Sequence, residues 1–342
     1  MQSAVGLGEA LFASAEDRRF AVALSNGLEL VESGLLAQVT FADNLADATA
    51  RYLFDAGGKR IRPTLALLTA QLGKGNTPEV IVAAQAIEIT HLASLYHDDV
   101  MDEAEVRRGV PSVQSVWGNS VAILTGDLLF ARAGRMVARL GDKAIELQAE
   151  TFERLCLGQL HETMGPNPDD DPVEHYLQVL RDKTGSLIAA AAQMGVIFSG
   201  APSEYEEPVR EFGEKIGVAF QLIDDVIDLA AEAEQTGKTP GTDLRAGVAT
   251  LPVLYLRNRA AHDPDAADLL ARIDRGANGG PAASDEFDAA VAELRAHPVT
   301  RETLDEAHRW AREGVEALSV LPAGPVRKAL TKFAHTLVER SN

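Results

Sequence analysis

The sequence predicts an all-α protein. Apolar residues recur at three- and four-residue steps along most of the 342-residue chain, whereas the alternating pattern of a half-buried strand is hard to find. Proline and glycine stand where helices commonly begin and end. Hydrophobic residues make up 46% of the chain, which is ample for a large buried core. We therefore expect a helical bundle.

Two helices are predicted in the first third of the chain. In residues 57–73, Pro63 opens an apolar run and Gly73 ends it. Residues 76–102 form the second helix: Thr77 is its N-cap, a proline follows directly, and apolar residues then recur at helical spacing. This helix is long enough to reach an acidic cluster at its C-terminal end.

Later segments divide into helices and loops. Residues 184–200 are uncharged but short and Ala-rich, and a membrane span needs about 20 strongly apolar residues, so we expect a buried core helix there. Residues 208–230 have helical spacing and also end in acids. Gly, Pro, Asp and Ser cluster in 165–172, 231–243 and 262–287, which predicts loops. We expect the last to be a surface insertion with a short helix at most.

Charge and cysteine content narrow the function. With 32 basic and 51 acidic residues the net charge is −19, which argues against a nucleic-acid partner, because phosphate binding needs a surplus of Lys and Arg. The single cysteine, Cys156, excludes an internal disulfide framework and a multi-cysteine zinc site. Residues 1–19 have no basic leader and do not resemble a signal peptide. We expect a cytoplasmic protein.

The stretch LYHDDVMDEAEVRRG carries three acids, Asp98, Asp99 and Asp102, at the end of the second helix. Asp98 and Asp102 are four residues apart and therefore share a helix face, on which His91 also lies. The acids are either a solvated helix end or the ligands of a cation. For one such motif in an acidic chain, the solvated end is the better interpretation.

A second acidic helix end changes that balance. The segment FQLIDDVIDL repeats the DDxxD spacing, and its polar stripe comprises Gln221, Asp224, Asp225 and Asp228. Carboxylates at this spacing repel one another unless cations neutralise them, and Mg²⁺ is the best fit among hard divalent ions. Mg²⁺ commonly completes its octahedron with substrate phosphates. We call Asp98, Asp99 and Asp102 the first comb, and Asp224, Asp225 and Asp228 the second comb. The two combs therefore indicate a diphosphate or triphosphate ligand.

Short basic motifs lie between and beside the combs. Each base alone is commonly a surface charge, but their joint order along the chain is not expected by chance. They stand in GGKRIRP, RRG, DKTG and GKTPGTDL, and the residues are Lys59, Arg62, Arg107, Arg108, Lys183 with Thr184, and Lys238 with Asp243.

This combination resembles the trans-isoprenyl diphosphate synthases, the polyprenyl synthetase family. GGKRIRP, HLASLYHDDVMDEAEVRRG, GDLLFARA, KTGSL, FQLIDDVIDL and GKTPGTDL stand in the family's order between about residues 50 and 255. The resemblance implies a single domain over residues 1–342, a helical bundle of the isoprenoid synthase type around a central cavity. It also implies head-to-tail condensation of isopentenyl diphosphate with an allylic diphosphate.

The same resemblance implies a role for each motif residue. Metal ligands would be Asp98, Asp102 and Asp224, which hold three Mg²⁺ ions on the allylic diphosphate. The resemblance assigns further residues to catalysis or to binding of that diphosphate, its metals or the allylic cation, and they are Asp99, Arg107, Lys183, Thr184, Gln221, Asp225, Asp228, Lys238 and Asp243. Isopentenyl diphosphate would be bound without metal by Lys59, Arg62, His91 and Arg108. On periodicity alone, His91 is instead a donor to core backbone.

The residues before the first comb address product length. A helical turn rises about 5.4 Å, roughly one extended isoprene unit, so side chains one and two turns before Asp98 would line the space for the growing tail. Ala93 and Ser94 are small, as are Thr90 and Ala86 further down. In short-chain members of the family that this chain resembles, a bulky aromatic tends to stand four or five residues before the first Asp and blocks the growing tail. Because the residues at these positions are small here, we expect a long-chain product, roughly C30 to C50. The alternative is that these residues are small to let two helices approach, which leaves a short-chain C15–C20 synthase open.

Other assignments remain. A terpene cyclase or a squalene-synthase-like enzyme also uses acidic helices and Mg²⁺, but it needs no isopentenyl diphosphate site. A non-catalytic subunit of a heteromeric synthase should have eroded combs, whereas both are intact here. From the resemblance we expect a homodimer, with at most transient membrane contact.

Overall fold

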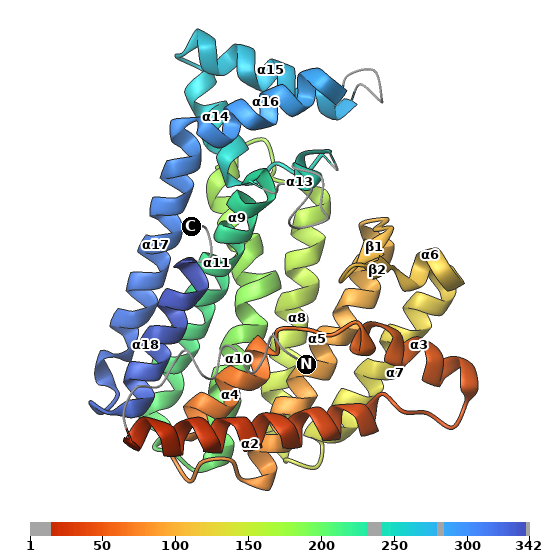
Figure 1. Cartoon of the computed structure of the whole chain (residues 1–342), viewed down its shortest axis with the longest axis vertical. Helices are drawn as coiled ribbons and strands as arrows, with labels where there is room; N and C mark the ends of the chain where they lie inside the picture. The colour runs from red at the N-terminus through yellow and green to blue at the C-terminus, as the bar shows by residue number, and fades with distance from the viewer. Residues whose placement is uncertain (1–14, 231–240, 246, 279–283, 340–342) are drawn as a thin grey trace. The chain divides into compact units, whose positions relative to one another are not determined.

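The computed structural model describes residues 15–230, 241–245, 247–278 and 284–339. Helices dominate these residues, and their only strands form one two-stranded hairpin, so the all-α prediction is confirmed (Figure 1). Up to the middle of the chain the elements are α2 Ala15–Gln38, α3 Asn44–Asp55, α4 Ile61–Ala70, α5 Pro78–Met101, β1 Val106–Arg107, β2 Val110–Pro111, α6 Val113–Trp117, α7 Asn119–Val137 and α8 Asp142–Met164.

The remaining elements continue the helical pattern. They are α9 Pro172–Leu180, the π-helical turn η1 Arg181–Gly185, α10 Ser186–Ser199, the 3₁₀ turn η2 Ser203–Tyr205, α11 Glu206–Ala230, α13 Thr242–Arg245, α14 Leu251–Ala260, α15 Pro264–Asn278, α16 Ser284–Ala296, α17 Pro298–Ala317, the 3₁₀ turn η4 Leu318–Val320 and α18 Pro325–Val338.

Contacts between residues divide the chain into two compact units. The first unit comprises Met1–Arg154, Ser186–Gly213 and Ala317–Phe333, and the second comprises Leu155–Gly185, Glu214–Glu316 and Ala334–Asn342. The single domain expected over residues 1–342 stays a prediction.

Helix α5 is the central element of the first unit. It packs against α2, α4, α7 and α10 and is apolar on most of its sides, with Ile87 and Leu92 among its buried residues. Its start is as predicted: the Thr77 side chain accepts a hydrogen bond from the Val80 N–H at 3.2 Å. Its end at Asp102, the C-cap, is also as predicted. A fully packed helix thus carries the first acidic comb on its last turn.

Helix α4 begins two residues before the predicted opener. Arg60, in a left-handed conformation, is the N-cap, and Pro63 lies in the first turn, where its missing N–H costs no intrahelical bond. The helix ends at Ala70, before Gly73. The start matters for the site because Lys59 and Arg62 flank the N-cap.

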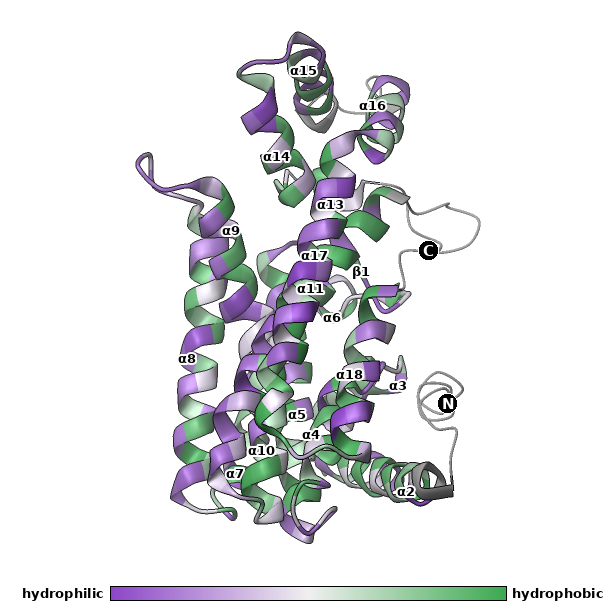
Figure 2. Cartoon of the chain, turned by 90° about the vertical axis from the view of Figure 1, so that its left-hand side faces the viewer, coloured by the Kyte–Doolittle hydropathy of each residue, from purple (hydrophilic) through white to green (hydrophobic). Residues whose placement is uncertain are grey.

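The predicted core helix is confirmed as α10, most of whose residues are buried. Among the described residues, one helix is long and apolar enough to cross a membrane by length and composition, and it is Arg19–Gln38 in α2 rather than α10. Hydrophobic residues recur along α2 (Figure 2). Its buried side chains, which include Val31 and Leu35, belong to the first unit, and α2 contacts α4 and α5 there.

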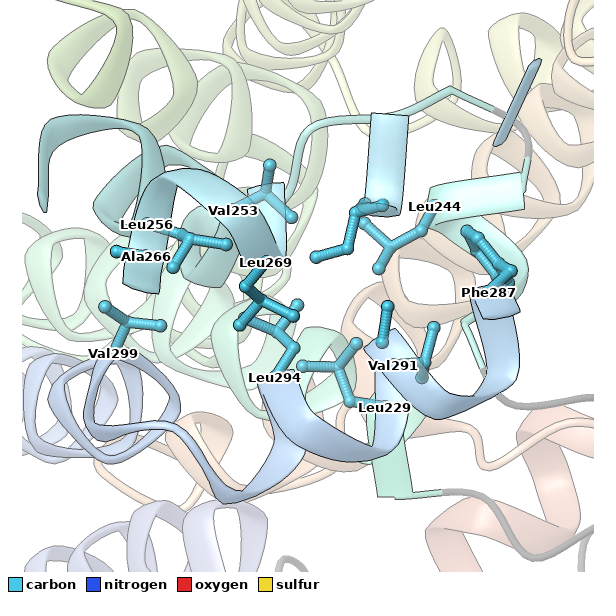
Figure 3. Close-up of a cluster of buried hydrophobic side chains, with 12 residues drawn as sticks. Leu229, Leu244, Val253, Leu256, Ala266, Leu269, Phe287, Val291, Leu294 and Val299 are labelled. Carbon is cyan, nitrogen blue, oxygen red and sulfur yellow. The ribbon is translucent and has the colours of Figure 1, made fainter. Parts of the chain in front are cut away.

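The expectation of a short helix at most in residues 262–287 was wrong. Helix α15 has 15 residues and α16 has 13, and α15 packs on both α14 and α16. Charged residues and glycines around α15 obscure one apolar face at helical spacing. Figure 3 shows the resulting cluster in the second unit, formed by Leu229, Leu244, Val253, Leu256, Ala266, Leu269, Ile273, Phe287, Ala290, Val291, Leu294 and Val299.

Candidate active site

The first comb extends from the C-terminal end of α5. Asp98 is half-buried in the last turn and Asp102 is exposed at the C-cap, where its N–H donates to the Asp98 carbonyl at 2.8 Å. A helix C-terminus carries partial negative charge, so acids there are unfavourable unless a cation is near. The two carboxylates are therefore poorly explained as elements of helix stability.

Asp99 is held differently from its neighbours in the comb. Its side chain is buried, and Oδ1 accepts a hydrogen bond from Arg107 Nε at 2.6 Å. Oδ2 is buried and has no hydrogen-bond partner among the described residues. Burial raises the pKa of Asp99, against the opposing effect of the Arg107 charge. Asp99 therefore anchors Arg107.

A tight hairpin presents the two arginines that follow the comb. Strands β1 and β2 pair with Arg107 opposite Val110, which leaves Arg108 and Gly109 as the turn, at φ 54° and 78°. Two positive φ angles suit a two-residue hairpin turn, but the first costs a non-glycine residue strain. Arg108 Nη1 donates to the Leu53 carbonyl in α3 at 2.7 Å. The sequence did not reveal this hairpin, because its strands are two residues long.

Two half-buried arginines of the first unit, Arg62 and Arg108, have perturbed pKa values. Burial lowers the pKa of Arg62 to about 10; Glu88 opposes this, and Arg108 adds to it. The pKa of Arg108 is also lowered, first by burial. Arg62 Nε is buried without a hydrogen-bond partner among the described residues, whereas Lys59 is exposed. A buried guanidinium N–H without an acceptor is costly, and a bound anion would satisfy it.

His91 responds to the same charges. Its pKa lies well below the ordinary value because of burial, followed by the charges of Arg62 and Arg108. The imidazole is therefore neutral near pH 7, with one N–H to donate. His91 is therefore influenced by the charges of Arg62 and Arg108, but it is itself uncharged and offers an N–H rather than a positive charge.

In the second unit, the π-helical turn Arg181–Gly185 carries Lys183 and Thr184. Lys183 pairs with Glu162 of α8, and Thr184 Oγ1 donates to Gln221 Oε1 of α11 at 3.5 Å. Gly158 of α8 permits close packing, since a Cβ there would lie 2.7 Å from the Lys183 backbone nitrogen. Single π-helical turns are frequent at functional sites.

The second comb lies on α11. Asp225 is 2% exposed and accepts a hydrogen bond from the Tyr176 hydroxyl at 2.5 Å. Burial raises the pKa of Asp225 to about 8; Tyr176 opposes this, while the charges of Asp243 and Asp224 add to it. Asp228 is half-buried, and its Oδ2 accepts from the Asp243 N–H at 3.2 Å. The start of α13 is thereby fixed to the comb.

The remaining predicted residues are Ala93 and Ser94, which precede the first comb, and Lys238. Ala93 and Ser94 are buried on α5, and Ser94 Oγ donates to the His91 carbonyl at 2.9 Å. Lys238 lies outside the described residues. Sequence reasoning missed Tyr176 and Glu88, because the DDxxD and basic motifs contain neither residue and only the tertiary fold brings each to its partner, Asp225 or Arg60. Among the described residues, no three His, Cys, Asp or Glu side chains form a group that could hold a metal by themselves.

Comparison with known proteins gives the family. The polyprenyl synthetase family model matches residues 43–287. Nonaprenyl diphosphate synthase of Mycobacterium tuberculosis is 44% identical over 326 residues, 95% of each chain. Octaprenyl diphosphate synthase of Escherichia coli is 35% identical over 312 residues, 91% of this chain and 94% of that protein.

A solved structure has the same fold as this chain. Geranylgeranyl pyrophosphate synthase of Corynebacterium glutamicum, complexed with calcium and isoprenyl diphosphate, has a TM-score of 0.82 and 38% identity, covering 97% of this chain and 99% of that one. The resemblance inferred from GGKRIRP, the two DDxxD combs and GKTPGTDL is confirmed. The chain belongs to the polyprenyl synthetase family.

Proposed function

We propose that the protein condenses isopentenyl diphosphate head to tail with an allylic diphosphate and releases a long-chain trans-polyprenyl diphosphate. One observation carries the proposal beyond family membership. Arg62 and Arg108 are cations of the first unit with lowered pKa values, and a buried N–H of Arg62 lacks an acceptor among the described residues. An enzyme that only ionises one diphosphate, such as a terpene cyclase, has no need for this second anion site.

The acidic combs fit Mg²⁺ bound together with substrate. Mg²⁺ is commonly held by one or two carboxylates, with waters and phosphate oxygens completing its shell. Carboxylates at two helix ends, with no group of three metal-binding side chains in the described ranges, match that requirement. Asp98, Asp102 and Asp224 would hold the ions, three in number. When bound, Mg²⁺ neutralises the charge that develops on the diphosphate leaving group.

The protein's own residues bind and orient the two substrates. Lys183, Lys238 and Arg107 grip the allylic diphosphate, and the hydrogen bond to Asp99 fixes Arg107 for this purpose. The oxygen dipoles of Thr184 and Gln221 face the allylic cation. Stabilisation by fixed dipoles costs no reorganisation during the reaction.

Isopentenyl diphosphate is held by Lys59, Arg62, Arg108 and the neutral N–H of His91. The planar forks of the arginines suit phosphate oxygens. The C–O bond between the allylic group and its diphosphate breaks first, and the double bond of isopentenyl diphosphate then attacks C1 of the resulting allylic cation. A proton then leaves for the departing diphosphate, and the chain is five carbons longer.

Long-chain product is proposed from α5 and from the relatives. Ala86, Thr90, Ala93 and Ser94 are small and buried before the first comb, and two relatives are named for octaprenyl and nonaprenyl products. Gln148 of α8 donates to Thr90 Oγ1 at 2.6 Å, two turns before Asp98. The pair would meet the tail at that depth.

We further propose a cytoplasmic homodimer that touches membranes at most transiently. Helix α7 supports the dimer because one of its faces leaves Ile123, Leu124 and Leu128 exposed, at 41%, 61% and 41%. Large apolar side chains gathered on one exposed helix face are typical of interfaces.

Label incorporation tests the function. The protein is incubated with Mg²⁺, farnesyl diphosphate and labelled isopentenyl diphosphate, and extractable products are counted. Label in prenyl products, lost on chelation of Mg²⁺, supports the proposal. Products that form from farnesyl diphosphate alone and contain no label would instead indicate a cyclase or a squalene-synthase-like enzyme.

A further inference from the structure

Arg60 of the basic motif is bound by two carboxylates of the protein, Glu32 and Glu88. Its Nε and Nη2 each donate to an oxygen of Glu32 at 2.8 Å, and Nη1 donates to Glu88 Oε1 at 3.2 Å. The guanidinium also lies 4.9 Å from the centre of the Phe54 ring and is 7% exposed. These bonds commit Arg60 to the protein rather than to a ligand.

The backbone of Arg60 sets the direction of the basic motif. Arg60 has φ 50° and ψ 36°, a left-handed conformation that a non-glycine residue keeps only when its surroundings hold it. Its carbonyl accepts the Thr64 N–H at 3.0 Å, which starts α4. Lys59 precedes this turn and Arg62 follows it. The side-chain bonds of Arg60 therefore fix the turn from which both extend.

Glu88 interacts with more than one arginine, through a hydrogen bond to Arg60 and through its charge with Arg62 and Arg108. It is 4% exposed on α5, and its Oε2 is buried without a hydrogen-bond partner among the described residues. Its charge raises the pKa values of Arg62 and Arg108 against the effect of burial. A Cβ on Gly58 would lie 2.8 Å from Arg60 Nη1 and 3.2 Å from Arg108 Nη2, so both guanidinium groups approach that glycine.

We infer that Glu32 and Glu88 are positioning residues for the isopentenyl diphosphate site. Through Arg60 they fix the turn that presents Lys59 and Arg62. Glu88 also reduces the repulsion between the half-buried Arg62 and Arg108, so that an anion meets a preformed site. The inference rests on the proposed function. Glu32 lies on α2, outside residues 43–287 of the family match, so α2 becomes part of the support of this site.

Steady-state kinetics with both substrates tests the inference. Glu88→Ala should raise the KM for isopentenyl diphosphate about tenfold or more, with kcat and the allylic KM within about twofold of wild type, because only uniform binding of one substrate is lost. Glu88→Gln keeps an acceptor for Arg60, so its KM for isopentenyl diphosphate should lie between those of wild type and Glu88→Ala. Glu32→Gln leaves Glu88 in place and should raise the same KM about threefold. Glu79→Ala, on the exposed first turn of α5, is the control and should match wild type.

Two outcomes overturn the inference. One is a normal KM for isopentenyl diphosphate in Glu32→Gln and Glu88→Gln, and the other is an equal rise of both KM values, which general loss of structure would produce. If Glu88→Ala is insoluble, the half-exposed Glu32 decides alone. Arg62→Ala separates the inference from the proposed function. A normal KM in Arg62→Ala refutes the site itself, whereas a raised KM there with normal Glu variants refutes only the positioning role.

Discussion

At the scale of single residues, the two combs share a design that their sequences do not reveal. The middle acid of each, Asp99 or Asp225, is buried and bonded to a side chain of the protein, Arg107 or Tyr176. The outer acids Asp98, Asp102, Asp224 and Asp228 are half-buried or exposed. The DDxxD pattern predicted all of these acids. It could not distinguish the buried middle acids from the outer ones, because Arg107 and Tyr176 lie outside the DDxxD pattern and the fold brings them to their partners.

The Asp225 carboxyl predicts a pH-dependent stability for the metal-free protein. Burial, with Asp243 and Asp224, raises its pKa from 3.8 to about 8, so between these values the folded protein keeps a proton that the unfolded chain has released. Stability should therefore fall as pH rises from 4 to 8, by on the order of a few kcal/mol. Asp225→Asn removes the titrating group and should flatten this dependence.

Denaturant unfolding in EDTA at pH 5 and pH 8 measures the effect. The variant should gain stability relative to wild type at pH 8 and differ less at pH 5. Equal changes at both pH values would show that Asp225 is ionised in the folded protein throughout the range.

At the scale of elements, capping chemistry and helical spacing predicted α5 and α11 well. Thr77 and the proline after it marked the start of α5, and the apolar spacing carried it to the first comb. Helices α15 and α16 escaped prediction because glycines, prolines and acids surround their apolar faces. Only the tertiary cluster that includes Phe287 makes those faces visible.

Phe287 tests the importance of that cluster. It is fully buried, and Gly276, Gly241 and the Arg245 guanidinium lie against its ring. Phe287→Ala should lower the free energy of unfolding by about 3–5 kcal/mol, as large-to-small core substitutions do. Chemical denaturation compares it with Val320→Ala, an exposed control. A loss of unfolding free energy below about 1 kcal/mol would mean that α15 and α16 contribute little to stability, because removal of the Phe287 ring would then leave no costly cavity.

Product length depends on the face of α5 before the first comb. Ala93→Phe should shorten the products while preserving the first condensations, because a ring there obstructs the tail without touching the metal ligands. Chromatography of dephosphorylated products from wild type and variant measures the change. Wild-type products of C20 or shorter would refute the long-chain assignment. An unchanged distribution in the variant would remove Ala93 from the path of the tail.

At the scale of the whole molecule, the motif residues could be predicted because each motif carries its own spacing. Their supports could not: Glu32, Tyr176 and the Leu53 carbonyl reach the site residues only through the tertiary fold. The face of α7 that we propose for the homodimer could not be identified from the sequence either, because apolar residues stand at both the exposed and the buried positions of α7. Burial in the structure separates them.

The exposed face of α7 predicts which substitution would disrupt the proposed homodimer. Leu124→Glu places a charge among Ile123 and Leu128, and like charges would then meet across a two-fold interface. Light scattering should show wild type at twice the 36.5 kDa of one chain and the variant at 36.5 kDa. Leu30→Glu on α2 is an exposed control that should leave the dimer intact. A dimeric Leu124→Glu would exclude this face as the interface.

The central claim is that one chain binds two diphosphates by different chemistry, one through Mg²⁺ and one through arginines. Calorimetric titration of isopentenyl diphosphate into the protein, in EDTA and then in Mg²⁺, tests it most directly. We predict binding in both conditions, and Arg62→Ala should weaken it in EDTA by about tenfold or more, as the loss of a charge-assisted pair would. Binding that appears only with Mg²⁺, or that Arg62→Ala leaves unchanged, would contradict the claim.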